Sequence, residues 1–189
     1  RQHEVDRMVR TGTWHKVTGT SLAGKTIGIV GMGSAGRALA GRAFASSMKV
    51  LVHDVVEVAP APEFEVVTLE QLVERSDVIS LHVPATPETR HLIDEDAIQS
   101  MKDGVWLINT SRGALVDEKE LVRGLEKGRV GGAALDVFEE EPIRPDNPLL
   151  GFENVIFGSH NGSNTHEAVA RTTERAVTNL IQGLREKDH

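Results

Sequence analysis

Three side chains in the second half of the sequence could together bind a carboxylate and move a proton. Arg112 directly follows an apolar run, and its planar guanidinium suits a two-point contact with a carboxylate and with an adjacent ketone oxygen. His160 is the candidate proton carrier, because imidazole titrates near neutral pH. Glu141 precedes Pro142, which restricts the backbone of Glu141 to extended conformations and could fix the direction of its side chain. A carboxylate bonded to His160 would hold one tautomer of the ring.

Each of these residues also has a purely structural interpretation. Arg112 could form an ion pair with a nearby acid. A single histidine such as His160 is more often a surface residue or a satisfied core residue. Glu141 ends the acidic run 139–141, which could simply be a solvated part of the surface. The residue types alone leave these alternatives open.

A glycine-rich turn early in the chain has the spacing of a phosphate-binding loop. Gly31, Gly33 and Gly36 directly follow an apolar run rich in β-branched residues. Gly31 allows a tight turn, Gly33 lets a backbone approach a pyrophosphate, and Gly36 lets a helix pack closely on the strand. From Ser34 and Ala35 the pattern becomes helical, and a helix N-terminus attracts phosphate. Alone, the spacing is a weak signal, because a tight strand-to-helix turn needs glycine without any ligand.

A carboxylate at the end of the second apolar run strengthens the case for a dinucleotide. Asp54 follows residues 50–52 and lies 18 residues after Gly36. An acid at the tip of the second strand can accept both hydroxyls of an adenosine ribose, and it would repel a 2′-phosphate. The structural alternative is that Asp54 only begins a turn. The order of strand, glycine turn, helix, strand and acid favours NAD over NADP as the cofactor.

Composition excludes several other classes of protein. The 189 residues are 39% hydrophobic and 26% charged, which is ordinary for a globular protein with a sizeable core. The formal charge of −7 argues against sequence-independent binding of nucleic acid. No apolar run approaches the length of a membrane span, no signal peptide opens the chain, and we expect a cytoplasmic protein. Without cysteine there are no disulfides, thiolate metal sites or cysteine nucleophiles, and we identify no metal site.

The elements that must position the candidate residues alternate between strand and helix. Apolar runs predict strands at 27–30, 50–52, 78–82, 105–108, 131–135 and 155–157. Periodicity and capping residues predict helices at 1–10, from 34, from 68, from 94, at 117–128 and from 165, with a proline-rich and acidic loop at 57–65. Apolar strands that alternate with helices form a parallel sheet covered on both faces. We therefore predict one α/β domain with a doubly wound parallel sheet of the Rossmann type.

The unusual polar residues follow the predicted strands. Their positions are Asp54, His82, 109–112, Asp136 and His160. In doubly wound sheets, ligands bind outside the carboxyl ends of the strands, and a random scatter would place about half of these residues at the other ends. The carboxyl edge of the sheet is therefore the predicted site.

Five segments make the sequence similar to the NAD-binding domain of the D-isomer-specific 2-hydroxyacid dehydrogenase family, which includes phosphoglycerate dehydrogenases. These segments are 31–36, 82–84, 109–113, 135–142 and 159–160. The most specific are Asn-Thr-Ser-Arg-Gly and Leu-Asp-Val-Phe-Glu-Glu-Glu-Pro, which occur in the family's order and spacing. The resemblance runs from about Trp14 to the final helix. It implies an enzyme that moves hydride between the nicotinamide and C2 of a D-2-hydroxy acid.

The resemblance also implies roles for single residues. Arg112 would bind the substrate, His160 would be the acid and base, Glu141 would support His160, and Asp136 would hold the nicotinamide carboxamide. The residues expected to contact NAD, from the glycine turn and from the resemblance together, are Gly31, Gly33, Ser34, Ala35, Gly36, Asp54, His82, Val83, Pro84, Thr110, Ser111, Arg112, Asp136, His160 and Gly162.

The sequence departs from the family in two respects. Ser159 stands where family members usually have proline before the histidine. The family also has a second domain that helps to grip the substrate, and this chain resembles the cofactor domain without it, with a helix and connector at 1–20 and a returning helix at 165–189. We therefore expect the chain to be inactive alone.

The resemblance also implies a homodimer formed through this domain. The amphipathic helix at 1–10 and Trp14 would supply contact surface. The alternative for Trp14 is that it covers an edge of the chain's own sheet.

Two functions of different classes fit the sequence. The first is a dehydrogenase acting on a small 2-hydroxy or 2-keto acid, where phosphoglycerate is slightly favoured and glyoxylate, hydroxypyruvate and lactate remain open. The second is an NAD-sensing scaffold resembling the C-terminal-binding corepressors, which keep the same catalytic set. The complete set of Arg112, Glu141 and His160 favours catalysis.

Overall fold

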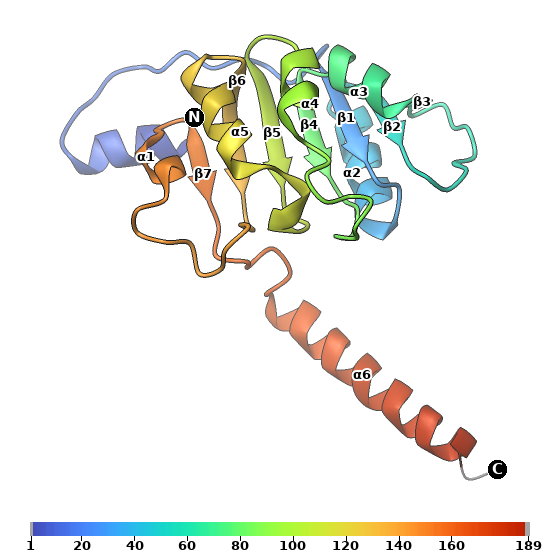
Figure 1. The fold of residues 1–189 in the computed structure, drawn as a ribbon. Helices are drawn as coiled ribbons and strands as arrows, with labels where there is room; N and C mark the ends of the chain where they lie inside the picture. The colour runs from blue at the N-terminus through green and yellow to red at the C-terminus, as the bar shows by residue number, and fades with distance from the viewer. Residues whose placement is uncertain (1, 188–189) are drawn as a thin grey trace.

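A single parallel sheet forms the centre of the protein. The computed structural model describes residues 2–187, with side chains described for 4–185, so the predicted bounds at Arg1 and at 188–189 lie outside the described residues. The sheet has seven strands in the order β3-β2-β1-β4-β5-β6-β7, and every pair of neighbours is parallel (Figure 1). The strands are β1 Thr26–Val30, β2 Lys49–His53, β3 Glu65–Val66, β4 Val78–Leu81, β5 Val105–Asn109, β6 Val130–Leu135 and β7 Val155–Phe157.

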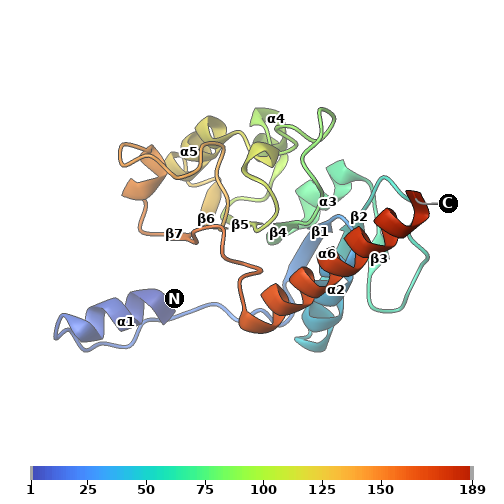
Figure 2. The same ribbon diagram turned by 90° about the horizontal axis from the view of Figure 1, so that it is seen from below.

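The described chain forms six α-helices, which are α1 Gln2–Arg10, α2 Ser34–Ala45, α3 Leu69–Arg75, α4 Glu95–Ser100, α5 Glu118–Glu126 and α6 His166–Lys187. Of these, α2 to α5 cover parts of both faces of the sheet (Figure 2). Figure 2 shows α2 against β1 and β2 on one face, whereas α4 and α5 cover β4 to β6 on the other. The chain moves outward from β1 to β3 and then returns to place β4 on the other side of β1. The predicted doubly wound α/β fold is confirmed, and β1 and β4 flank its topological switch point.

Apolar side chains fill the space between the sheet and the helices. One core cluster lies around Leu72, Leu107 and Leu121, which are fully buried, and it joins α3, α4 and α5 to the sheet. A second cluster packs α2 on Ile29 and Val52, which are also fully buried. Burying apolar area of this kind is the main favourable contribution to folding.

Capping residues begin the helices where the sequence predicts. Thr68 Oγ1 accepts a hydrogen bond from the backbone N–H of Gln71, whose side chain accepts one from the N–H of Thr68. The carboxylates of Asp94 and Asp117 also accept hydrogen bonds from backbone N–H groups in the first turns of α4 and α5. These caps satisfy N–H groups that have no partner within a helix.

The short edge strand β3 is absent from the sequence prediction. The predicted loop at 57–65 is wrong at its last residue, because Glu65 pairs with Leu51 of β2. Both residues of β3, Glu65 and Val66, are exposed. A strand of two exposed residues carries neither a buried run nor an alternating pattern, so its sequence has no signal of a strand.

Part of one sheet face has no helix against it. Trp106 and Ile108 alternate with fully buried neighbours in β5 and are themselves only half-buried. Ile156 of β7, which lies in the same row across the sheet as Ile108, is 41% exposed. Among the described helices, none lies directly against β5 to β7 on the side of α2 (Figure 2). Parallel sheets are normally covered on both faces, so this apolar surface is open to a further partner.

Both ends of the chain also expose apolar side chains. Helix α6 stands away from the sheet (Figure 1) and exposes Val177 and Leu180. Trp14, in the connector after α1, is 87% exposed, so the alternative that it covers the chain's own sheet edge is wrong. None of the helices in the described part of the chain is both long and apolar enough to cross a membrane.

Candidate active site

The glycine turn joins β1 to α2 at the carboxyl edge of the sheet. Gly31 has a φ of +99°, and a side chain there would meet the backbone carbonyl of His82. Gly36 lies against the carbonyl oxygen of Gly31, so the helix approaches the strand as closely as a glycine allows. Ser34 and Ala35 are exposed at the N-terminus of α2, where backbone N–H groups have no partner within the helix.

Asp54 lies beside this turn and is tied to it. Its Oδ2 accepts a hydrogen bond of 2.6 Å from the N–H of Met32, and its Oδ1 accepts one of 3.0 Å from Val56. Burial raises the pKa of Asp54, but the backbone hydrogen bonds, that from Met32 foremost, lower it more, so the pKa lies below its ordinary value. The carboxylate therefore begins a turn and also places a negative charge next to the glycine loop.

The end of β4 supplies the next group of predicted residues. His82 is half-buried, its Nε2 lies 2.9 Å from Ser80 Oγ, and burial lowers its pKa, so the ring is neutral at physiological pH. The carbonyl of Val83 accepts a 2.8 Å hydrogen bond from Ser111 Oγ. This bond ties the segment 82–84 to the loop after β5.

The loop after β5 presents Thr110 and Arg112 to solvent on a fixed backbone. Asn109 is only 1% exposed, and its side chain donates to the carbonyl of Arg112 (2.8 Å) and accepts from the N–H of Ser111 (3.0 Å). The Arg112 guanidinium donates to the carbonyl of Ser111, and it forms no ion pair with any described residue. The structural alternative for Arg112, an ion pair with a nearby acid, is therefore not seen.

Sequence reasoning did not assign a role to Asn109. An asparagine at the end of an apolar strand could have indicated such a role. A buried polar side chain must satisfy its hydrogen bonds within the protein, so its amide is expected to bond to nearby atoms. In this case its partners are the backbone atoms of the loop that carries Arg112.

Asp136, at the end of β6, holds the loop that follows β7. Its Oδ1 accepts from the N–H of Asn161 (3.0 Å) and its Oδ2 from that of Gly162 (2.7 Å). Its carbonyl also accepts a 2.7 Å bond from the N–H of His160, which has a φ of +56°. Asp136 thus fixes the backbone that presents His160, in addition to any contact with a cofactor.

Glu141 and His160 meet at this edge of the sheet. Glu141 Oε2 lies 2.7 Å from His160 Nδ1, and Glu141 Oε1 accepts a 3.0 Å bond from the N–H of Phe138. The hydrogen bond to His160 is the main cause that lowers the pKa of Glu141 below its ordinary value, so this carboxylate is ionised at neutral pH. Nε2 of His160 has no hydrogen-bond partner among the described residues, and the ring is half-exposed.

A close contact brings the loops of Arg112 and Glu141 together. Gly113 is buried against the backbone of Phe138, so the loop of Arg112 touches the loop of Glu141. A pocket of about 350 Å³ opens beside the carboxylate–histidine pair. It is lined by Phe138, Glu141, Pro142, Ile143, Ser159 and His160.

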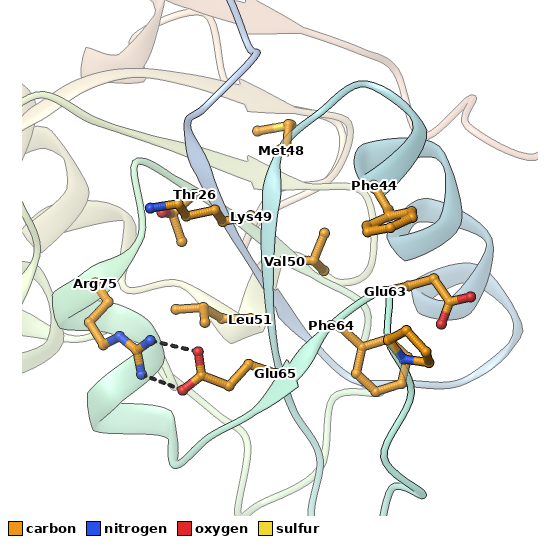
Figure 3. Close-up of a pocket in the computed structure, with 11 residues that line it drawn as sticks. Thr26, Phe44, Met48, Lys49, Val50, Leu51, Glu63, Phe64, Glu65 and Arg75 are labelled. Atoms are coloured by element: carbon orange, nitrogen blue, oxygen red, sulfur yellow. Dashed lines mark hydrogen bonds and ion pairs between the residues drawn. The ribbon is translucent and has the colours of Figure 1, made fainter.

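A larger pocket of about 560 Å³ lies elsewhere and contains none of the predicted residues (Figure 3). It is formed by the first residues of β1, β2 and β3 and by the loop before β3, so it belongs to the amino ends of the strands. Its most prominent polar contact is the two-point ion pair between Arg75 and Glu65, at 2.9 and 2.7 Å. The candidate catalytic and cofactor-binding residues therefore lie at the opposite edge of the sheet, at the carboxyl ends of the strands.

The fold and this edge define a dinucleotide-binding domain. Residues 1–162 match the family described as the D-isomer specific 2-hydroxyacid dehydrogenase, NAD binding domain. The chain belongs to this family, and it is an NAD-binding domain of the Rossmann type.

Relatives with known names support this assignment. The chain is 45% identical to a glyoxylate reductase of Thermofilum pendens, over 96% of this chain and 57% of that protein. It is 40% identical to a D-3-phosphoglycerate dehydrogenase of Archaeoglobus fulgidus, over 96% of this chain and 36% of that protein. The D-lactate dehydrogenase of Aquifex aeolicus, solved with NAD and lactic acid, superposes with a TM-score of 0.89 at 33% identity, over 98% of this chain and 62% of that one. The chain thus spans little more than half the length of the glyoxylate reductase.

Proposed function

We propose that this chain is the cofactor-binding part of an NAD-dependent D-2-hydroxyacid dehydrogenase, in which Arg112, Glu141 and His160 act on the substrate. The observation that carries the proposal is the pair of Glu141 and His160, whose free Nε2 lies on the same edge of the sheet as the glycine turn. The family assignment supplies the reaction class. The hydrogen bonds of these residues support the proposed roles.

The residues of the glycine turn fit the cofactor. Gly33 is exposed, and a Cβ at its position would have no neighbour within 4 Å, so a phosphate can approach the backbone. The exposed start of α2 offers free N–H groups to the same phosphate. Each oxygen of Asp54 accepts one backbone bond and keeps a second lone pair for a ribose hydroxyl. When bound, NAD supplies a nicotinamide carbon that accepts or donates hydride.

Proton transfer falls to His160. Because the Glu141 carboxylate accepts only, the hydrogen bond between them places a proton on Nδ1. Nε2 is then the nitrogen that takes the hydroxyl proton of a 2-hydroxy acid in oxidation, and that returns it to the oxygen in reduction. Glu141 stabilises the imidazolium that forms in the first case.

Arg112 would hold the substrate. Its guanidinium has five donors, and among the described residues it makes one hydrogen bond, to the carbonyl of Ser111. The remaining donors suit a two-point contact with a substrate carboxylate, and they can also polarise the neighbouring C2 oxygen. Orienting the substrate in this way is a large source of rate enhancement.

The substrate class we propose is the small 2-oxo acids. Two relatives at 45% identity are glyoxylate reductases, and one at 39% is a hydroxypyruvate reductase. Glyoxylate and hydroxypyruvate are therefore preferred to phosphoglycerate, which the sequence alone slightly favoured.

The test is turnover by a longer protein that contains this chain within a dehydrogenase of about the full length of the glyoxylate reductase relatives. His160→Gln should lower kcat by about 10²–10⁴-fold on glyoxylate or hydroxypyruvate, while the Kd for NAD changes little. His15→Gln, in the exposed connector, is the matched control and should leave both values unchanged. Full turnover by His160→Gln would overturn the role of His160. Binding of peptides without turnover of any 2-oxo acid would favour a scaffold function instead.

We also propose that two copies of this domain associate. The open sheet face carries Trp106, Ile108 and Ile156, and the same chain exposes Trp14 and Val9. In a two-fold dimer, the segment with Val9 and Trp14 of each copy can cover the open sheet face of the other copy. Sedimentation should show a dimer at micromolar concentration, and Trp14→Ala should shift the equilibrium toward monomer. A wild-type chain that stays monomeric at high micromolar concentration would contradict the proposal.

A further inference from the structure

Glu118, the first residue of α5, holds the loop that carries Glu141 at two points. Its Oε1 accepts a 2.6 Å hydrogen bond from the backbone N–H of Glu139. Its Oε2 accepts a 3.0 Å bond from Nδ2 of Asn147. The two contacts lie before and after Glu141 in the chain, so one carboxylate fixes both ends of the segment. None of the roles assigned above uses Glu118.

The N–H of Glu139 belongs to a peptide unit that is also packed against the loop of Arg112. Gly113 follows Arg112 directly and is buried. A Cβ at Gly113 would overlap the carbonyl group of Phe138 and the nitrogen of Glu139. The peptide unit between Phe138 and Glu139 is therefore fixed by Gly113 through packing and by Glu118 through a hydrogen bond.

The direction of Glu141 depends on this peptide unit. Because a peptide unit is planar, a bond that fixes the N–H of Glu139 also fixes the carbonyl of Phe138. The N–H of Phe138 donates to Glu141 Oε1 (3.0 Å), and the other oxygen of Glu141 meets His160. The donor and the acceptor of this bond are only three residues apart, so a rotation of the peptide unit between them would separate them.

The partners of Glu118 are both donors, which a carboxylate suits better than an amide. A carboxylate only accepts, and hydrogen bonds to it are about twice as strong as those between neutral groups. Asn147 cannot turn its oxygen toward Glu118 without loss, because Oδ1 accepts a 2.9 Å bond from the N–H of Leu149. Glu118 is half-buried, so water competes less for these bonds than at an exposed site.

We propose that Glu118 is a positioning residue that fixes the loop of Glu141 relative to the loop of Arg112. Its effect on turnover rests on the proposed dehydrogenase function, but the contact between the two loops does not. Without Glu118, the N–H of Glu139 loses its acceptor, and packing alone holds the peptide unit before it. The carboxylate of Glu141 then leaves its place more often, and the ring of His160 loses a fixed partner.

Hydrogen exchange of single amides in this chain tests the contact without turnover. In Glu118→Ala, the amides of Glu139 and Phe138 should exchange roughly tenfold faster than in the wild type, because a hydrogen bond is lost and the loop opens locally. The amide of Leu107, in the buried strand β5, should change much less. Glu95→Ala is the matched control, because Glu95 is likewise the first residue of its helix. It should leave the amides of Glu139 and Phe138 unchanged.

Turnover by the longer protein tests the consequence for catalysis. Glu118→Ala should lower kcat on glyoxylate by roughly tenfold, because a small misplacement of a catalytic group is costly. KM should change less, since Arg112 keeps its own loop contacts. In a Glu141→Ala background, Glu118→Ala should change kcat by less than about twofold, because its effect passes through Glu141. A wild type without turnover would contradict the proposed function, and the exchange experiment would then decide the role of Glu118.

Three results would overturn the proposal. The first is that the Phe138 amide of Glu118→Ala exchanges as in the wild type. The second is that Phe138 and Leu107 accelerate equally, which would show a general loss of stability. The third is an equal fall in kcat with and without Glu141. If Glu118→Ala fails to fold, Glu118→Asp decides instead. It keeps the charge at the start of α5, but its side chain is one methylene shorter, so the Phe138 amide should still exchange faster. Exchange as slow as in the wild type would contradict the proposal.

Discussion

At the scale of single residues, the direction of Glu141 decides which nitrogen of His160 is available for chemistry. Pro142 predicts an extended backbone for Glu141, but it does not say where the carboxylate points. The structure supplies the missing contact, which is the hydrogen bond from the N–H of Phe138 to Oε1. With one oxygen held by its own loop, the other meets Nδ1 of His160. A bond between a backbone atom and a side chain three residues away leaves no trace in the residue types.

Glu141→Gln should change both the stability and the pH profile. The pKa of Glu141 lies below its ordinary value of 4.5, so the folded state favours the ionised form. The resulting stabilisation is present above the unfolded pKa and is lost as pH falls through the folded pKa. The side chain is 36% exposed, so the gain near pH 7 should not exceed about 1 kcal/mol.

Urea denaturation of the wild type and of Glu141→Gln should therefore show a difference in stability near pH 7. This difference should shrink as the pH falls below the ordinary titration range of a carboxylate, about 4. In a longer, active protein, the acidic limb of the kcat/KM profile should also move to lower pH, because an amide no longer favours the imidazolium form of His160. A profile that does not move would mean that Glu141 serves only the loop.

Asp54 should decide between the two forms of the cofactor. Its carboxylate lies at the tip of β2, ionised and tied to the glycine turn through Met32. We expect NAD to bind more tightly than NADP, because a 2′-phosphate would meet this negative charge. Asp54→Asn keeps a hydrogen-bond acceptor and removes the charge, so it should narrow the ratio of the two affinities by roughly tenfold, or about 1.4 kcal/mol. Calorimetry with both cofactors measures this, and equal binding by the wild type would contradict it.

At the scale of elements, long buried segments are readable from the sequence and short exposed ones are not. Six of the seven strands are apolar runs, which leave a continuous signal in the sequence. β7 keeps such a run although two of its three residues are exposed. β3 has no such apolar run, since it consists of Glu65 and Val66, which are both exposed. The same limit applies to the site. All the predicted residues follow strands or begin α2. The bonds of Asn109 and the hydrogen bond between His91 and Glu139 depend instead on loop atoms that meet only in the folded chain.

Gly36 and Gly41 both lie in α2, but only Gly36 faces the turn after β1, so the two can be compared to test how closely the helix must approach the strand. A Cβ at Gly36 would meet the carbonyl oxygen of Gly31, whereas a Cβ at Gly41 has no neighbour within 4 Å. Gly36→Ala should therefore destabilise the protein by about 1–3 kcal/mol, as overpacking does. Gly41→Ala should stabilise it by up to about 1 kcal/mol, the difference in helix propensity. Urea denaturation compares them, and a Gly36→Ala variant as stable as the wild type would mean that the turn can widen without cost.

At the scale of the whole molecule, the protein has two surfaces that the described chain leaves open. One is the apolar face of β5 to β7, with Ile156 exposed, which the proposed dimer would cover. The other is the carboxyl edge, where Arg112 is exposed and the ring of His160 is half-exposed. The glycine turn and Asp54, which we propose to hold the cofactor, lie beside that edge. The groups proposed to act on the substrate therefore face solvent, while those for the cofactor are held in place.

This difference predicts that the chain binds NAD but turns over 2-oxo acids slowly. In the proposed site, NAD would contact the start of α2, Asp54 and the loops after β4 and β5, all of which the folded sheet already holds in place. A substrate held only by Arg112 stays solvated and free to rotate, so most of the advantage of orientation is lost. We expect kcat/KM on glyoxylate to be at least about 10²-fold lower for this chain than for a longer protein that contains it, at similar Kd for NAD. NADH consumption by the two proteins measures this. Equal kcat/KM values would mean that Arg112, Glu141 and His160 suffice on an open edge, and that water need not be excluded for hydride transfer here.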